Sequence, residues 1–190
     1  MNRDYRPLSP MRFYRWVGIL SLSILAACSA NTGNNKNLRD SKTGSSKVVS
    51  AEGDFSLLDT DGKRVHLSDF SGKVLLVSFW ATWCEPCQLE LPQLQKLWKK
   101  YRGQGFELLT ICADGADTQS EVKRLIRRYR YDFPVLLDQS GEVTDKFNPS
   151  MELPFSMLMD TNGKIISRHQ GYRPGDEKQI EQEIGQLLHD

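Results

Sequence analysis

The feature that most constrains this chain is a nearly continuous apolar run that leads into two closely spaced cysteines. Residues 74–80 read Val-Leu-Leu-Val-Ser-Phe-Trp, and Cys84 and Cys87 follow shortly afterwards. A run of this kind is typical of a central strand whose two faces are both covered. Apolar side chains then recur at helical spacing, at Leu91, Leu94, Trp98 and Tyr101. The sequence therefore places Cys84 where a buried strand ends and a helix begins.

Beyond residue 51, apolar runs alternate with amphipathic stretches, which predicts one α/β domain with a central mixed β-sheet flanked by helices. Strands are expected at 55–58, 64–67, 74–80, 106–112, 135–137, 155–159 and 165–169. Helices are expected after Cys84, at 119–131, at 142–147, and over a C-terminal stripe of Ile180, Ile184, Leu187 and Leu188. The first two strands should form an N-terminal hairpin.

The N-terminal segment has the pattern of an export signal. Arg12 and Arg15 precede a short apolar run, 16–27, which ends in small residues before Cys28. A helix needs roughly 20 apolar residues to cross a hydrocarbon core, so this run is too short for a permanent span. Residues 25–28, Leu-Ala-Ala-Cys, resemble the bacterial lipobox. That resemblance implies a lipoprotein signal peptide over 1–27 and lipidation of Cys28, the alternative being a plain secretory signal.

Residues 28–50 are expected to tether the domain to a membrane. This segment is rich in Asn, Ser, Thr, Gly and Lys, so it cannot bury enough apolar surface to offset its conformational entropy. The folded domain is then expected over 51–190. Ser29 stands where lipoproteins kept at the inner membrane usually have Asp. We therefore expect the protein on the periplasmic side of the cell envelope, with the outer membrane favoured over the inner.

Charge and histidine placement argue against nucleic acid and metal partners. Without residues 1–27 the chain has slightly more acidic than basic side chains, and phosphate backbones demand a basic patch. The histidines lack the spacing of zinc ligands; they are His66, His169 and His189. Gln88 follows Cys87 where a c-type haem attachment would require His. We expect no nucleic acid, no metal and no cofactor.

The position of Cys84 predicts thiol chemistry. Unpaired amides at a helix N-terminus stabilise a thiolate, which lowers the pKa of such cysteines. Pro86 is compatible with the first helical turn, where its missing N–H costs nothing, and Cys87 lies one turn on. Cys84 is the predicted nucleophile and Cys87 the predicted resolving thiol of a dithiol–disulfide couple. The alternative is a structural disulfide or two small packed side chains.

Residues 79–87, Phe-Trp-Ala-Thr-Trp-Cys-Glu-Pro-Cys, resemble the active-site segment of the thioredoxin superfamily, and specifically its exported TlpA/ResA-like branch. The resemblance covers most of 51–190 and implies a thioredoxin-like fold. It also implies that Pro154 is a cis proline lying against the redox pair, where its neighbour's backbone binds extended substrate. Judged by sequence alone, a proline before a strand is only a turn or edge residue, and Pro134 is the competing candidate.

Glu90 matches an acidic residue that, by the same resemblance, tunes the thiols and assists proton transfer; the alternative is a solvated helix carboxylate. Ser78 stands where thioredoxin itself has a buried Asp, so any assisting carboxylate must be Glu90. Negative charge from Glu85 and Glu90 would disfavour the Cys84 thiolate, which favours a reductant over an oxidant.

Three further side chains near the motif are expected to have structural roles rather than roles in the reaction. Trp80 and Trp83 are expected to pack in the core and to shield the cysteine pair. Cys112 lies in an apolar strand and is expected to be buried and inert.

These features predict a membrane-tethered, monomeric oxidoreductase that reduces disulfides of exported proteins. Its partners would be protein disulfides or thiols and a membrane electron donor, and apocytochrome c is one possible client by family analogy. One alternative is a thiol peroxidase, whose usual Pro-x-x-x-Thr-x-x-Cys signature is absent before Cys84. A non-enzymatic, lipid-anchored binding module is the other alternative.

Overall fold

The computed structural model of the protein describes residues 53–189. The predicted signal peptide, Cys28 and the predicted tether lie outside the described residues, so the expectations for them stay predictions. Between residues 53 and 189, none of the helices combines the length and the apolar character that a membrane span requires.

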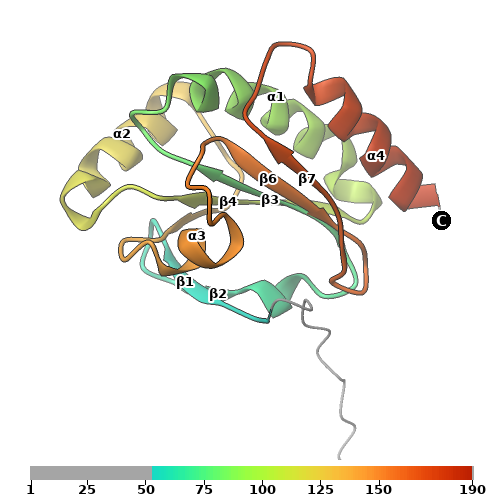
Figure 1. The fold of residues 1–190 in the computed structure, drawn as a ribbon, viewed down its shortest axis with the longest axis horizontal. Coiled ribbons are helices and arrows are strands. Elements are labelled where there is room, and N and C mark those ends of the chain that lie inside the picture. Colours follow the sequence, from blue (N-terminus) through green and yellow to red (C-terminus); the bar gives the residue numbers. More distant parts are fainter. Residues whose placement is uncertain (1–52, 190) are drawn as a thin grey trace, which may run out of the picture. The chain divides into compact units, whose positions relative to one another are not determined.

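Within the described residues, seven strands form one mixed sheet in the order β2-β1-β5-β4-β3-β6-β7 (Figure 1). The strands are β1 (Ser56–Asp59), β2 (Arg64–His66), β3 (Val74–Trp80), β4 (Phe106–Cys112), β5 (Val135–Leu137), β6 (Phe155–Met159) and β7 (Ile165–Gln170). The central strands β3, β4 and β5 run parallel, and the other neighbouring pairs are antiparallel. The predicted fold class, including the hairpin of β1 and β2, is confirmed.

Helices cover both faces of the sheet. They are α1 (Glu85–Tyr101), α2 (Gln119–Tyr129), α3 (Glu142–Phe147) and α4 (Glu177–His189), with short 3-10 helices η1 (Leu67–Phe70), η2 (Arg102–Gln104) and η3 (Ala116–Thr118). Figure 1 shows α1, α2 and α4 on one side of the sheet and α3 on the other. Each side has its own hydrophobic core, as expected when a sheet is buried on two faces.

The alternation of side chains along β3 determines what meets α1. Leu76 and Trp80 lie in the core that contains residues of α1 and α4, whereas Val77 and Phe79 lie in the opposite core. Successive side chains of a strand point to opposite faces. Ser78 therefore shares the face of Leu76 and Trp80 and points toward α1.

Five elements were predictable to the residue. β1 is shifted by one residue from 55–58 and β7 extends one residue beyond 169, whereas the departures at β2 and α2 come from backbone conformation. Observed and expected bounds agree for 74–80, 106–112, 135–137, 142–147 and 155–159. β2 ends at His66 because Leu67 begins η1. α2 ends at Tyr129, short of residue 131, because Arg130 adopts a left-handed conformation with φ 55° and its N–H bonds back to the helix.

Candidate active site

Cys84 caps the N-terminus of α1. The chain leaves β3 at Trp80, turns through Ala81, and the Cys84 amide donates to the Ala81 carbonyl at 3.2 Å. Cys84 has extended dihedral angles, φ −87° and ψ 103°, and α1 begins at the next residue. Its Sγ accepts a hydrogen bond from the Cys87 backbone N–H at 3.3 Å. A negative charge on this sulfur would be stabilised by that amide and by the helix N-terminus.

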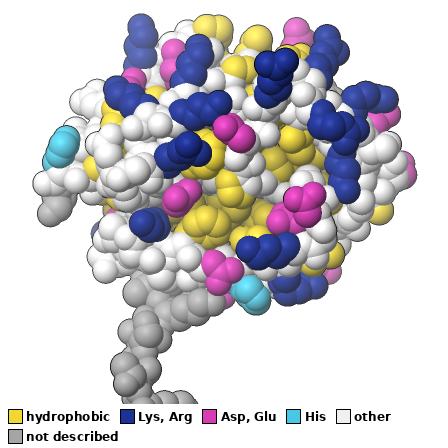
Figure 2. All heavy atoms as spheres, turned by 180° about the vertical axis from the view of Figure 1, so that it is seen from behind, with side chains coloured by type: hydrophobic (Ala, Val, Ile, Leu, Met, Phe, Trp, Pro, Cys, Tyr) yellow, Lys and Arg dark blue, Asp and Glu magenta, His cyan; other side chains and the backbone are white. Residues whose placement is uncertain are grey.

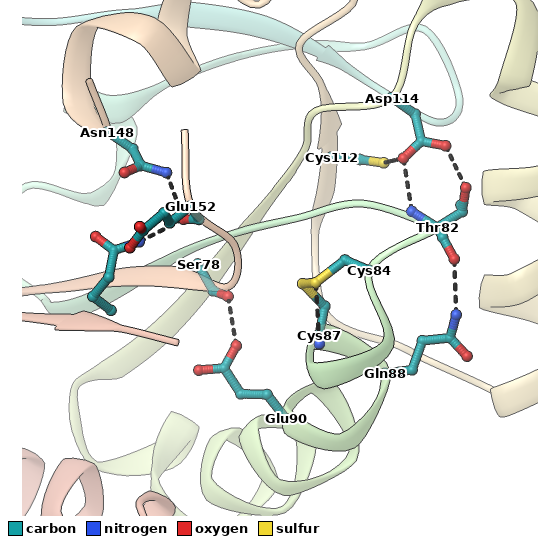
Figure 3. The surroundings of a disulfide bond; sticks show 11 residues. Ser78, Thr82, Cys84, Cys87, Gln88, Glu90, Cys112, Asp114, Asn148 and Glu152 are labelled. Carbon is teal, nitrogen blue, oxygen red and sulfur yellow. Dashed lines mark hydrogen bonds between the residues drawn. A yellow bond between two sulfur atoms is a disulfide. The ribbon is translucent and has the colours of Figure 1, made fainter. Parts of the chain in front are cut away.

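Cys84 and Cys87 are joined by a disulfide, with 5.3 Å between their Cα atoms (Figure 3). Cys84 keeps 5% of its surface exposed, whereas Cys87 is completely buried. Pro86 lies in the first turn of α1, as predicted. Only the Cys84 side of the disulfide reaches the surface, and this asymmetry supports Cys84 as the sulfur that meets a substrate.

Glu90 lies one turn after Cys87 on α1 and is 1% exposed. The Ser78 hydroxyl donates to Glu90 Oε2 at 3.3 Å. Burial raises the pKa of Glu90 from 4.5 to about 8, the Asp176 charge adds to that rise, and the Ser78 hydrogen bond opposes it. The solvated-carboxylate alternative is therefore wrong. The raised pKa favours the protonated carboxyl, which weakens the negative charge that Glu90 was expected to place near Cys84.

A row of polar side chains crosses the sheet beneath α1 and leads away from Glu90. Strand register aligns Thr110, Ser78, Ser156 and His169 on neighbouring strands. Residues in register share a face of the sheet. His169 lies 2.9 Å from Glu183, and it shares with Glu90 the lining of a cleft of about 320 Å³. Glu90 therefore borders this cleft, although only 1% of its surface is exposed.

A network that sequence reasoning missed fixes the loop before Cys84. The carboxylate of Asp114, which is 4% exposed, accepts hydrogen bonds from both the backbone N–H and the hydroxyl of Thr82. The Gln88 side chain, from the first turn of α1, also donates to the Thr82 carbonyl of this loop at 2.8 Å. Asp114 follows β4, and β4 is parallel to β3, so the carboxyl ends of both strands meet at this edge. The parallel pairing of β3 and β4 was the feature from which the position of Asp114 beside the active-site loop could have been predicted.

The predicted burial of Trp80 and of Cys112 is confirmed, whereas the inertness of Cys112 stays a prediction. Trp80 and Cys112 are completely buried, and burial raises the pKa of the Cys112 thiol well above its ordinary value. The Cys112 sulfur also lies 3.3 Å from Asp114 Oδ1. The expectation that Trp83 packs in the core is wrong, because its side chain is 71% exposed. Trp83 lies beyond the end of β3, in the loop before Cys84, and its ring faces solvent beside the disulfide.

Pro154 lies beside the disulfide-bearing loop, and its peptide bond with Leu153 is cis. β6 runs antiparallel to β3 with Phe155 opposite Phe79, so Pro154 comes next to the carboxyl end of β3. Its carbonyl accepts the Gly171 N–H at 2.8 Å. Pro134 is elsewhere, before β5, where its carbonyl accepts from the Thr110 amide and hydroxyl. The role of Pro154 in binding substrate stays a prediction.

The described part of the chain, residues 53–189, contains no group of three or more His, Cys, Asp or Glu arranged to hold a metal ion. His66 is the last residue of β2 in the N-terminal hairpin, and His169 on β7 pairs with Glu183, so neither histidine lies in the loop or helix turn that carries the cysteine pair. The site is built from two sulfurs, one buried carboxyl and the loop that positions them.

A mixed sheet with helices on both faces, a Cys-x-x-Cys disulfide at the start of the helix after the central strand, and a cis proline next to the carboxyl end of that strand define the thioredoxin-like oxidoreductases. The Redoxin family matches residues 30–184, and the chain belongs to this family. Within it, the chain is a homologue of the ResA thiol-disulfide oxidoreductases.

Two curated relatives and one solved structure illustrate the similarity. "Thiol-disulfide oxidoreductase ResA" of Oceanobacillus iheyensis is 36% identical over 166 residues, which are 84% of this chain and 82% of that protein. ResA of Bacillus thuringiensis subsp. konkukian is 38% identical over 117 residues, 62% of this chain and 66% of that protein, so the match spans just under two thirds of its length. The crystal structure of the exposed lipoprotein thioredoxin Etrx1 of Streptococcus pneumoniae superposes with a TM-score of 0.61 at 29% identity, over 71% of this chain and 100% of that one.

Proposed function

We propose that this protein is an extracytoplasmic thiol-disulfide oxidoreductase that reduces disulfides of exported proteins through Cys84 and Cys87. The observation that carries the proposal is the disulfide at the N-terminus of α1, with one sulfur at the surface and the other buried. The names of the ResA relatives support the reaction class.

The proposed reaction moves two electrons from the protein to its substrate. In the reduced protein the Cys84 thiolate attacks a substrate disulfide, the substrate S–S bond breaks, and one substrate thiolate leaves and takes up a proton. Cys87 then loses its proton and attacks Cys84 Sγ in the mixed disulfide. The second substrate thiol is released and the Cys84–Cys87 disulfide forms. A membrane electron donor of the dithiol class would return two electrons to restore the reduced pair.

Glu90 is suited to handle the proton of Cys87. Residues three apart on a helix lie on one face, which places the Glu90 side chain beside Cys87. A general base works best when its pKa lies near the operating pH, and the pKa of Glu90 is raised by burial to about 8. When Glu90 is ionised, its carboxylate would accept the Cys87 proton as Cys87 attacks, and the cleft shared with His169 would carry the proton to solvent.

A redox titration of the Cys84–Cys87 pair tests the direction of the reaction. Glu85 in the first turn of α1 still places an acidic side chain near Cys84, which disfavours the thiolate and favours a reductant. We expect a reduction potential near or below about −270 mV, the value typical of thioredoxin. A potential near about −120 mV, that of a strong oxidant, would contradict the reductase assignment. The Cys112→Ala variant is the matched control, since its thiol is buried and takes no part in the disulfide.

Membrane attachment through Cys28 is the second part of the proposal. The lipobox-like residues 25–28 support it, and the name of the structural relative Etrx1 includes the word lipoprotein. We propose a monomer on the periplasmic side of the envelope, held at the outer membrane in preference to the inner, with apocytochrome c among its candidate clients. In cells, the wild-type protein should take up labelled fatty acid and pellet with membranes. Cys28→Ala should lose the label and the attachment, and a variant that still pellets would contradict lipid anchoring at Cys28.

A further inference from the structure

A second cleft of about 320 Å³ lies next to the active-site loop. Figure 3 shows Gln88 and Glu90 on opposite sides of the disulfide, and this cleft is on the Gln88 side. Its walls come from the loop and first turn around Cys84 and from α2. They include Thr82, Trp83, Gln88, Arg124 and Arg128, and Glu121 is the one acidic residue among them. The exposed ring of Trp83, directly before Cys84, therefore forms one wall of a hollow that faces α2.

The exposed surface of α2 is strongly basic, although the domain as a whole is nearly balanced in charge, and two of its arginines, Arg124 and Arg128, line this cleft. Four exposed basic residues lie on α2 and a fifth directly follows it, against one acidic residue, Glu121; the five are Lys123, Arg124, Arg127, Arg128 and Arg130. In Figure 2, which views the molecule from behind, Lys and Arg side chains are spread over the upper half of the face, including the upper right, where α2 lies. The negative end of the helix dipole explains basic residues in the last turn, but Arg124 lies before it.

The two arginines of the cleft are spaced to act together. Arg124 and Arg128 are four residues apart, so they project from the same face of α2, and like charges at this spacing disfavour the isolated helix. Arg124 lies 3.4 Å from Glu121, in a pair exposed to solvent. The Arg128 guanidinium lies over the Tyr129 ring at 5.5 Å, a contact that leaves its N–H groups able to bind an anion. The face is therefore cationic and aromatic, with little carboxylate to neutralise it.

We propose that this cleft binds a carboxylate side chain of the disulfide substrate, in the polypeptide segment next to the cysteine that reacts with Cys84. The inference rests on the proposed reductase function and adds a substrate preference to it. Arginine pairs favour Asp and Glu by charge and by bidentate geometry, and Trp83 and Leu125 provide apolar contact for the same segment. Because Trp83 directly precedes Cys84, a chain held at Cys84 reaches the cleft within a few residues.

Two synthetic peptides, each with one intramolecular disulfide, test the proposal. One carries Asp and Glu beside the reacting cysteine and the other carries Asn and Gln at the same positions. The full-length protein is reduced, freed of reductant, and mixed with each peptide. The measured quantity is the second-order rate constant for oxidation of the protein by that peptide. We expect the acidic peptide to react about fivefold faster at low salt, the scale of one exposed ion pair, and the ratio to fall toward one as salt screens the arginines.

Paired substitutions on α2 separate this cleft from general charge. In Arg124→Gln/Arg128→Gln, the ratio of the rate constants for the acidic and the amide peptide should fall to about one. Lys123→Gln/Arg127→Gln makes the same charge change on the same helix, but these side chains line a different depression, with Thr60 and Asp61, so it should keep the fivefold ratio.

Three outcomes would overturn the inference. The first is equal rates for both peptides with the wild-type protein, and the second is an equal loss of preference in both double variants. The third is binding to vesicles of anionic phospholipid that requires Arg124 and Arg128 while the peptides show no preference, which would assign the cleft to a membrane surface. A protein that neither peptide oxidises would instead refute the proposed reductase function, so the two failures are distinguishable.

Discussion

Replacing Glu90 with Gln should make the free energy of unfolding less sensitive to pH. Burial raises the pKa of Glu90 from 4.5 to about 8 in the folded protein, so between these pH values the unfolded chain releases a proton that the folded chain retains. The stability that this group contributes is complete below pH 4.5, declines as pH rises, and is lost once pH exceeds about 8. Gln cannot ionise, and its amide oxygen can still accept the Ser78 hydroxyl, so the variant should lack this decline.

The size of the effect follows from the separation of the two pKa values. One pKa unit corresponds to about 1.4 kcal/mol, so the whole separation amounts to about 5 kcal/mol, of which about 3 kcal/mol falls between pH 5 and 8. Urea denaturation of the oxidised protein at several pH values in this range measures it. The difference in unfolding free energy between the variant and wild type should move by about 3 kcal/mol in favour of Glu90→Gln from pH 5 to pH 8.

The matched control is Glu142→Gln, which removes an exposed carboxyl from the first turn of α3. Its stability should follow the wild-type pH profile. If the unfolding free energies of Glu90→Gln and wild type change in parallel with pH, to within about 0.5 kcal/mol, the account of a buried, protonated carboxyl is refuted. Such a result would also remove the argument that Glu90 serves as a base for Cys87.

Three further substitutions test the fold and the site. Asp114→Ala should lower the unfolding free energy by about 2 kcal/mol, because two Thr82 donors lose a buried acceptor, and a loss below about 0.5 kcal/mol would show that the network does not fix the loop. Phe147→Ala should cost about 3 kcal/mol in urea denaturation, since the ring packs on Phe55 and Phe79 in the core beneath α3, and an unchanged midpoint would contradict that packing. Cys112→Ala should leave the reduction potential of the pair within about 10 mV of wild type, a third of the roughly 30 mV that marks a tenfold change in equilibrium, and a larger shift would give Cys112 a redox role.

The order of the elements could be predicted from the sequence because the central strands β3, β4, β5 and β6 are buried along most or all of their length. β3 and β4 are apolar along almost their whole length, and such runs end where the strand leaves the core. The errors arose where a single residue changes the backbone. Leu67 is apolar and extends the pattern of β2, yet it begins η1, and Arg130 ends α2 through a left-handed conformation that no hydrophobic pattern reveals.

The cysteine pair could also be predicted, because its chemistry depends on local position at a strand–helix junction. The surroundings of the pair could not, since they depend on tertiary contacts. Glu90 is buried because α1 packs on the face of β3 that carries Ser78. Trp83 is exposed because it lies in the loop beyond the end of that strand. Asp114 is 32 residues from Thr82 in the chain, and only the parallel pairing of β3 and β4 brings them together.

The central claim is that Cys84 attacks the substrate and Cys87 then resolves the mixed disulfide, and trapping that intermediate tests it most directly. Cys87→Ala protein is incubated with a disulfide-bonded protein substrate, quenched with acid, and mapped by mass spectrometry without reduction. A substrate cysteine linked to Cys84, and absent from Cys84→Ala protein treated in the same way, is the predicted result. A substrate linked to Cys112, or the recovery of no mixed disulfide while wild-type protein reduces the same substrate, would contradict it.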